Sequence, residues 1–244
     1  MPQIATISLV IPVFNEEDNL PILAEQIRQA LEPLEAQGRT FKAIFIDDGS
    51  RDGSLAVMRD IAKADPRFCY LAFAANCGQS AGFGAGFEAA QGDVVVTMDA
   101  DLQNDPADIP AMIETFEAQD ADMVIGWRQK RRDSWIKRIA SKIGNNVRNR
   151  LTRETVRDTG CSLKVMRADM ARRMPMFHGM HRFMPTLMKL QGAKVVEVPV
   201  NHRPREHGQS KYGTLDRAMA GGYDLFAVRW MQSRHRRWEI KERG

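Results

Sequence analysis

Short β-rich apolar runs alternate with amphipathic helical patterns along the first half of this chain, and this alternation constrains the fold more than any other feature. The apolar runs typical of buried strands are residues 7–11, 41–46, 68–73, 94–98 and 123–125. The segments with apolar residues at the three- and four-residue spacing of a helix are 20–34, 55–62, 81–90 and 109–116. We therefore predict an α/β fold with a Rossmann-like, mostly parallel central sheet flanked by helices.

The second half has a different pattern, which begins after Gly126. A basic helical stretch comes first, followed by a short strand at 163–166, helical patterns near Met170 and Leu187, and a strand at 195–200. If the binding site holds two substrates, we expect this half to bind the acceptor, the substrate that receives the transferred group.

The last part of the chain is mixed in character. Segment 215–231 combines apolar, aromatic and charged residues and is followed by basic ones, which fits either an ordinary terminal helix or a helix at a membrane interface. At 244 residues and 43% hydrophobic, the chain can bury one substantial core. We predict a main domain at 1–212 and an amphipathic, basic C-terminal helical extension at 213–244.

The cysteines and the hydropathy pattern bear on location. Cys69, Cys77 and Cys161 have neither a disulfide-type nor a metal-type spacing, so a reducing cytoplasm is expected. There is no signal-like start and no uninterrupted apolar run of about 18 residues, which predicts a soluble or peripheral protein.

Positive charge is concentrated in one segment. Residues 128–153 carry ten Lys or Arg against the single acid Asp133, within a formal net charge of +4. Nucleic acid, phosphate esters and an acidic membrane surface all suit such a segment, and so does a plain solvated helix face.

Acidic residues follow three of the predicted strands. Glu16 follows the first strand, Asp47 and Asp48 follow the second, and Asp99 and Asp101 follow the fourth. Because ligands bind beyond the carboxyl ends of the strands in such sheets, we expect these acids to meet at a binding crevice. Each acid alone is weak evidence, since Asp is common in turns.

The acids after the fourth strand suggest a metal. Asp99, Asp101 and Gln103 alternate along the chain, so in an extended conformation their side chains point the same way. Oxygen ligands of this kind suit Mg²⁺, which is usually held by one or two carboxylates plus substrate phosphates, and Mn²⁺ accepts the same ligands. Asp105 and Pro106 also predict a helix start, which does not account for the two acids before them.

Two nearby features have both a binding and a structural interpretation. Asp47 and Glu16 are placed to accept hydrogen bonds from a nucleobase or a ribose, whereas Asp48 is more typical of a tight turn. The glycine-rich run from Gly78 to Gly86 lacks a phosphate-binding pattern, and close helix packing explains it at least as well.

Five sequence blocks then occur in the order found in family 2 glycosyltransferases. They are residues 10–17 (VIPVFNEE), 47–53 (DDGSRDG), 76–78 (NCG), 99–103 (DADLQ) and 205–211 (REHGQSK). More narrowly, the chain resembles the dolichol- and polyprenyl-phosphate sugar transferases, a branch favoured by the last block. The resemblance covers about residues 5 to 215 and implies a GT-A type fold.

The resemblance implies roles for the matching residues. The nucleotide-sugar-binding positions match Pro12, Phe14, Glu16, Phe45, Asp47, Gly78, Asp99, Ala100 and Arg128. The metal-binding positions match Asp101 and Gln103, with Mg²⁺ or Mn²⁺ as cofactor. The catalytic positions match Asp101, Arg205, Lys211 and Asp158. Cations in this set would offset the repulsion between two phosphate-bearing substrates.

Three positions depart from the family pattern. Phe14 stands where a Tyr is common, and Cys161 and Lys164 replace an aromatic residue and an Arg. Phe14 lacks one hydroxyl but keeps the apolar wall of the donor site, whereas Cys161 and Lys164 bear on the acceptor side.

The reaction implied is transfer of a sugar, with inversion, from a UDP- or GDP-sugar to a polyprenyl phosphate. A phosphomonoester has a second pKa near ~6, so it is already an anionic nucleophile at neutral pH and needs no strong base. Because that acceptor is a lipid, we expect a peripheral protein on the cytoplasmic face of a membrane. Either the amphipathic stretch around Phe226 and Trp230 or a membrane-protein partner would bring the protein to the lipid.

Other functions remain open at this point. A family 2 transferase acting on a saccharide hydroxyl would need a base, for which Asp158 is the best candidate. A non-catalytic nucleotide-sugar sensor would bind the donor without turnover. A nucleic-acid-binding module is disfavoured because the basic run is short and lacks interleaved aromatic residues, so no nucleic-acid partner is expected. A nucleotidyltransferase is disfavoured because no glycine-rich basic loop follows the first strand.

Overall fold

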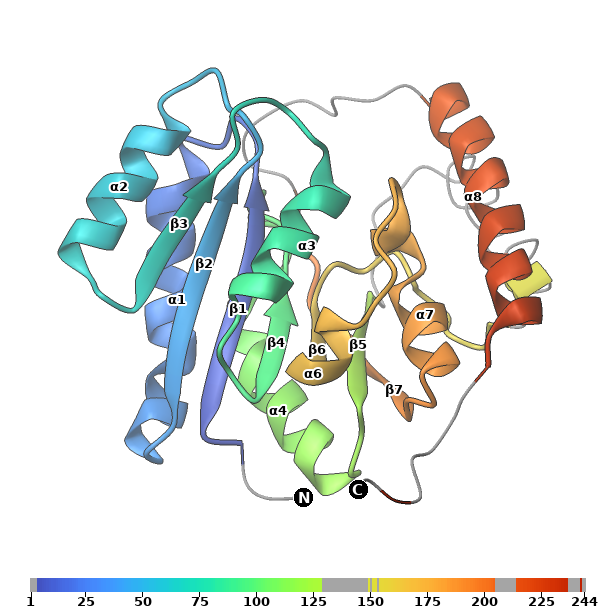
Figure 1. Ribbon diagram of the computed structural model, residues 1–244. Helices are drawn as coiled ribbons and strands as arrows, with labels where there is room; N and C mark the ends of the chain where they lie inside the picture. Colours follow the sequence, from blue (N-terminus) through green and yellow to red (C-terminus); the bar gives the residue numbers. More distant parts are fainter. Residues whose placement is uncertain are drawn as a thin grey trace.

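A computed structural model describes residues 4–128, 149, 151–152, 154–204, 214–236 and 242, with the side chains of the last helix described from residue 222. A seven-stranded sheet lies at its centre (Figure 1). The strands are β1 (Thr6–Val13), β2 (Thr40–Asp47), β3 (Phe68–Ala72), β4 (Val94–Thr97), β5 (Met123–Arg128), β6 (Lys164–Arg167) and β7 (Val195–Val200). All of the predicted strands are therefore confirmed, with small differences at their ends.

The helices also lie where the apolar spacing predicted them. They are α1 (Asn19–Ala36), α2 (Ser54–Ala64), α3 (Gln79–Ala89), α4 (Ile109–Ala118), α6 (Ala168–Arg172), α7 (Met184–Leu190) and α8 (Thr214–Arg234), with short 3₁₀ helices η1 (Pro106–Asp108) and η2 (Met180–Arg182). Most of the basic stretch at 128–153 lies outside the described residues.

The sheet is mostly parallel, as predicted. Its strand order is β3-β2-β1-β4-β6-β5-β7. Strands β3, β2, β1 and β4 pair in parallel, and so do β5 and β7. Strand β6 is antiparallel to both of its neighbours, β4 and β5. The antiparallel strand β6 therefore lies between a parallel set of four strands, β3, β2, β1 and β4, and a parallel pair, β5 and β7.

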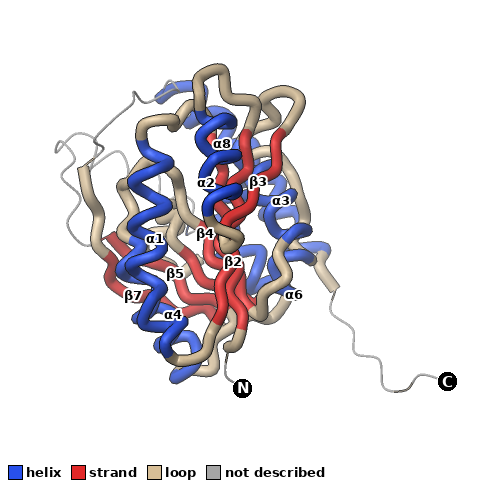
Figure 2. The backbone as a smooth tube through the Cα atoms, turned by 90° about the vertical axis from the view of Figure 1, so that its left-hand side faces the viewer, coloured by secondary structure: helices blue, strands red, loops and turns tan. Residues whose placement is uncertain are grey.

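Two layers of helices bury the two faces of the sheet. Helices α1, α2 and α4 contribute to one apolar core, and α3, α6, α7 and α8 contribute to the other. Figure 2 shows α1 and α4 on one side of the strands and α3 and α6 on the other. Successive residues of β1 alternate between the cores, Leu9 and Ile11 facing one and Val10 the other, as the two-residue period of a strand requires.

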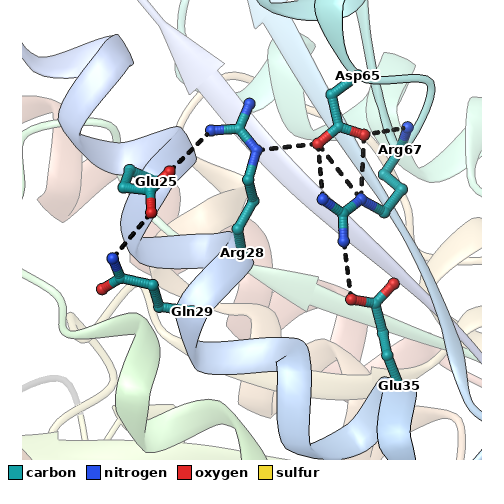
Figure 3. Close-up of polar contacts among 6 residues, drawn as sticks. All are labelled: Glu25, Arg28, Gln29, Glu35, Asp65 and Arg67. Carbon is teal, nitrogen blue, oxygen red and sulfur yellow. Dashed lines mark hydrogen bonds and ion pairs between the residues drawn. The ribbon is translucent and has the colours of Figure 1, made fainter.

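A polar network ties α1 to the start of β3 (Figure 3). The carboxylate of Asp65 accepts hydrogen bonds from Arg67 Nη2 at 2.8 Å and from Arg28 Nε at 2.9 Å. Arg67 also forms an ion pair with Glu35 at 2.8 Å. The hydrogen bond from Arg67, helped by that from Arg28, lowers the pKa of Asp65 well below its usual range. The charges in this network compensate one another.

Helix α8 has one buried and one exposed face. Leu225 and Val228 are buried in the second core, at 7% and 0% exposure. Tyr223, Phe226 and Trp230 are 80%, 71% and 63% exposed. In the part of the chain that the structure describes, no helix is both long enough and apolar enough to cross a bilayer.

Candidate functional site

Three acidic strand ends lie side by side at one edge of the sheet. Strand β1 pairs in parallel with β2 on one side and with β4 on the other. The register aligns Val13 with Asp47 and Val10 with Thr97, so the three carboxyl ends point the same way. The loops after β1, β2 and β4 therefore leave the sheet at the same edge, which is where the sequence predicts a binding crevice.

Hydrogen bonds join the loops after β1 and β2. The backbone N–H of Asn15 donates to Ser50 Oγ at 2.9 Å, and that of Glu16 donates to Ser54 Oγ at 2.8 Å. The Asp47 carboxylate is buried and accepts the N–H of Ser50 at 3.1 Å, which closes the turn after β2. Glu16 and Asp47 are thereby held at the same edge.

The loop after β4 turns sharply. Leu102 has a φ of 60°, and Asp101 Oδ1 accepts the N–H of Gln103 at 3.2 Å. The expectation of one extended run with alternating side chains is therefore wrong here, because Asp101 forms an Asx-type turn with Gln103. Asp101 is buried, at 7% exposure, and Gln103 is half-buried in the same turn.

Asp99 is held from two sides within this loop. Gln79 Nε2 donates to Asp99 Oδ1 at 2.7 Å, and the Ser162 side chain, which donates to Asn104, lies on another side of the carboxyl group. Burial, and then the negative charge of Asp101, raise the pKa of Asp99 above its usual value. The positive charges of Lys164 and Arg128 act in the opposite direction but do not reverse the shift.

Arg128 and Asp158, which were assigned to the donor and the acceptor side, form one ion pair. Arg128 Nε lies 2.7 Å from Asp158 Oδ2, and Arg128 Nη2 lies 2.9 Å from Asp158 Oδ1. Lys164 is almost fully buried and donates to the carbonyl of Cys161. Burial lowers the pKa of Lys164. A buried cation and an ion pair thus lie close enough to Asp99 to affect its pKa.

The predicted apolar donor-binding residues differ in their placement. Pro12 and Phe14 are half-buried at the end of β1. Ala100 is 3% exposed. Phe45 is fully buried, and its ring stacks on that of Phe68 with centroids 5.8 Å apart. The structure therefore places Phe45 in the core and not on the crevice.

The glycine run packs α3 tightly against the sheet. A Cβ atom on Gly86 would lie 2.1 Å from Val10 Cγ1, and one on Gly82 would lie 3.1 Å from Pro12 Cβ. Close helix packing is therefore the explanation for these two glycines. Gly78 is different, because it precedes α3 and its N–H donates to Asp48 at 3.0 Å.

The segment just before the predicted phosphate-binding residues Arg205 and Lys211 contacts the loop after β4. The N–H of Arg203 donates to the carbonyl of Gln103 at 2.9 Å, and the Arg203 side chain forms an ion pair with Asp105 at 2.6 Å. Asp105 also caps η1, as predicted. Arg205 and Lys211 lie outside the described residues.

Sequence reasoning missed three polar residues around Asp99. Besides Gln79 and Ser162, Asn104 is part of the arrangement, because its Oδ1 accepts from Ser162 Oγ at 2.6 Å and from the N–H of Asp99 at 3.4 Å. The available signal for Gln79 was its position directly after the block at 76–78. Ser162 and Asn104 belong to no pattern that points to them.

The residues at this edge fit a divalent cation. Asp101 and Gln103 supply oxygen atoms, and they lie next to Asp99, whose pKa is raised by burial and by the charge of Asp101. Within the described ranges, no three His, Cys, Asp or Glu side chains are grouped so that they could hold a metal alone. A set of this size suits an ion that is also bound by substrate phosphates.

Comparison with known proteins identifies the family. The model for glycosyl transferase family 2 matches residues 8–174, and the chain belongs to this family. It is 37% identical over 210 residues to the undecaprenyl-phosphate 4-deoxy-4-formamido-L-arabinose transferase of Edwardsiella ictaluri, covering 86% of this chain and 63% of that protein. It is 35% identical over 226 residues to the dodecaprenyl-phosphate galacturonate synthase of Rhizobium johnstonii, covering 91% of this chain and 66% of that protein. The chain thus spans about two thirds or less of the length of these two relatives.

Solved structures agree on the fold. Glucosyl-3-phosphoglycerate synthase from Mycobacterium tuberculosis, in complex with Mn²⁺, UDP and phosphoglyceric acid, matches with a TM-score of 0.68 at 16% identity, covering 96% of this chain and 80% of that one. The same enzyme with Mg²⁺ and UDP matches with a TM-score of 0.67 at 16% identity, covering 93% of this chain and 79% of that one. The mostly parallel sheet with flanking helices is the predicted GT-A type fold.

Proposed function

We propose that this protein transfers a sugar from a nucleotide-diphosphate sugar to a polyprenyl phosphate. The observation that carries the proposal is the similarity, over 86% and 91% of the chain, to two transferases whose names specify polyprenyl-phosphate acceptors. The acids gathered at the ends of β1, β2 and β4 support it, because they provide a donor site at the edge where GT-A type sheets bind ligands.

The donor occupies the crevice between these loops. Glu16 and Asp47, held by the hydrogen bonds between the first two loops, face the base and ribose, and Asp99 faces the diphosphate. Either a UDP- or a GDP-sugar fits this assignment, since carboxylates accept hydrogen bonds from both bases.

A divalent cation, Mg²⁺ or Mn²⁺, would be held by Asp101 and Gln103 together with the donor diphosphate. When bound, it would offset the negative charge that develops on the leaving nucleoside diphosphate. The fit of these residues supports this assignment, as does the presence of Mn²⁺ or Mg²⁺ in the structural neighbours.

In the reaction, a phosphate oxygen of the acceptor attacks the anomeric carbon and forms a new C–O bond. The bond from that carbon to the diphosphate breaks, and its electron pair leaves with the nucleoside diphosphate, so the sugar is transferred with inversion. Arg205 and Lys211 are proposed to stabilise the charge on the phosphates.

A saccharide hydroxyl as acceptor receives less support. That reaction needs a general base to remove the hydroxyl proton, and Asp158 was the best candidate for it. Both oxygens of the Asp158 carboxylate accept hydrogen bonds from Arg128. An acid paired in this way is a weak base, whereas an anionic phosphate acceptor requires none.

The lipid acceptor implies contact with a membrane, and helix α8 offers a suitable surface. Tyr223, Phe226 and Trp230 are exposed on it, and the exposed Arg234 and Arg236 follow. Aromatic residues flanked by arginines suit an interface with anionic lipid. We propose peripheral binding on the cytoplasmic face; a membrane-protein partner would serve the same purpose.

Vesicle sedimentation tests this membrane contact. The variant Phe226→Ser/Trp230→Ser should bind vesicles containing phosphatidylglycerol about tenfold more weakly, because two exposed aromatic side chains are lost. Tyr70→Ser, at another exposed aromatic residue, is the matched control and should bind as wild type does. If all three proteins bound vesicles equally, α8 would not be the membrane-binding surface, and a partner protein would have to provide the membrane contact.

A further inference from the structure

Asp48, the second acid after β2, holds the loop that precedes α3. Its carboxylate is 4% exposed and accepts the N–H of Cys77 at 2.6 Å and that of Gly78 at 3.0 Å. Asn76 Nδ2 donates to the same carboxylate at 2.9 Å and to the Asp48 carbonyl at 3.0 Å. The side chain that the sequence assigned to a simple turn therefore organises a second loop 28 to 30 residues further along the chain.

The two loops are also in close steric contact. Gly49 has a φ of +71°, and a Cβ atom there would lie 2.7 Å from the backbone nitrogen of Asn76. Gly78, two residues after Asn76, has a φ of +87° and leads directly into α3. The path of the chain between Asn76 and the first turn of α3 is thus fixed by the turn after β2.

The first residue of α3 is the one that contacts Asp99. Gln79 follows Gly78, and its Nε2 donates to Asp99 Oδ1 at 2.7 Å. An amide is a suitable partner at this position, because it donates a hydrogen bond without adding charge beside Asp101. Asp99 is in this way oriented by a residue whose own position depends on Asp48.

We propose that Asp48 is a positioning residue of the donor site, acting through the loop Asn76–Gly78 and Gln79 on the carboxylate of Asp99. Its own carboxylate accepts three N–H groups, and that of Gly78 contacts both oxygens, so we infer that Asp48 acts on the donor through the loop and does not bind the donor itself. The inference rests on the proposed function, since it takes Asp99 to face the donor diphosphate.

The alternative is that Asp48 serves stability alone, and the chain contains a matched control for that alternative. Asp93 also uses its carboxylate to accept backbone N–H groups, those of Ala5 at 2.9 Å and Thr6 at 2.8 Å. These contacts lie at the start of β1, the end of the strand opposite to the donor site. Asp93→Asn therefore removes comparable hydrogen bonds without reaching the site.

The test is calorimetric titration of UDP and GDP, with Mn²⁺ present, into wild type and four variants. The variants are Asp48→Asn, Gln79→Met, the double variant Asp48→Asn/Gln79→Met, and Asp93→Asn. Titrations are run below the lowest melting temperature of the set, so that every protein is folded. Methionine at position 79 keeps the length of glutamine and removes the N–H donors.

We expect Asp48→Asn and Gln79→Met each to weaken binding of the preferred nucleotide about tenfold, and the double variant to be no weaker than the weaker single variant, because the two residues act in one path. Asp93→Asn should bind as wild type does, even where its melting temperature falls as far as that of Asp48→Asn. Wild-type affinity in Asp48→Asn, or losses that multiply in the double variant, would overturn the positioning role. If wild type itself bound neither nucleotide, the proposed function would fall together with it.

Discussion

Asp65 and Asp99 are both acids beside the parallel half of the sheet, but their surroundings differ. Asp65 lies before the start of β3 and is paired with Arg67 and Arg28, which lowers its pKa (Figure 3). Asp99 lies after the end of β4, where burial and the neighbouring Asp101 raise its pKa. At the first site the hydrogen bonds from arginines outweigh the effect of burial on the pKa, whereas at the second site burial and a like charge outweigh the effect of Lys164 and Arg128.

We interpret this difference as one between a stabilising site and the proposed donor site. Charges that are paired within the protein stabilise the folded state and leave no unpaired charge for a ligand to bind. Buried like charges cost stability in the free protein, and their perturbed pKa values are typical of functional sites. On this comparison, changes at Asp101 and Asp99 should affect function, and changes at Asp65 should affect stability.

The largest expected effect is at Asp101. Asp101→Ala should reduce sugar transfer by at least about a thousandfold, because it removes a proposed metal ligand where charge develops in the proposed reaction. Its melting temperature should not fall below that of wild type by more than a few degrees. A variant with the wild-type rate in a radiolabelled sugar-transfer assay would remove Asp101 from the donor site.

A smaller loss of activity is expected at Lys211. Lys211→Ala should lower kcat about a hundredfold while changing donor affinity much less, because its charge is proposed to act on phosphates in the transition state. Initial rates over a range of donor concentrations separate the two constants. If the KM for donor rises and kcat stays constant, Lys211 binds the ground state and has no special role in transfer.

Asp65→Asn should lower the stability of the protein and leave its activity unchanged. We expect a loss of about 1–2 kcal/mol at pH 7, because the two arginines lose a charged acceptor at a partly exposed site. Since the pKa of Asp65 is lowered by folding, its contribution is present above the unfolded pKa of about 3.9 and is lost as the pH falls below it.

Urea unfolding at pH 7 and near pH 3 checks this prediction. The stability gap between wild type and Asp65→Asn should narrow at the lower pH, while transfer rates at pH 7 stay equal. A gap that persists unchanged in acid would mean that the charge of Asp65 is not what stabilises the network.

Asp99→Asn should have the smallest effect on stability, and its sign should be opposite. The raised pKa means that folding disfavours the ionised form, so a neutral side chain should raise stability at pH 7 slightly. The same urea experiment measures it. A destabilisation as large as that of Asp65→Asn would show that Asp99 is compensated after all, and the comparison between the two sites would fail.

Much of the fold could be predicted because it follows from local patterns. Apolar runs such as 94–98 have few ways to be buried other than as central strands, and the alternation with helices implies a parallel sheet. The same reasoning placed the acids that follow three strands at one edge of the sheet, because parallel strands end at the same edge.

The details of the site depend on geometry that the sequence does not display. The turn at Leu102, with its positive φ, ends the extended run assumed for Asp101 and Gln103. The ion pair between Arg128 and Asp158 joins residues 30 positions apart that were given separate roles. Such contacts depend on how loops pack together, and side-chain spacing along one segment carries no information about them.

Sugar transfer itself tests the central claim most directly. Purified protein is incubated with a short polyprenyl phosphate, Mn²⁺ or Mg²⁺, and a panel of UDP- and GDP-sugars, and lipid-linked sugar is detected by mass spectrometry. We expect one preferred donor and a glycosylated lipid phosphate whose formation stops when a chelator is added. Donor hydrolysis or binding without any lipid product, at every donor tested, would contradict it.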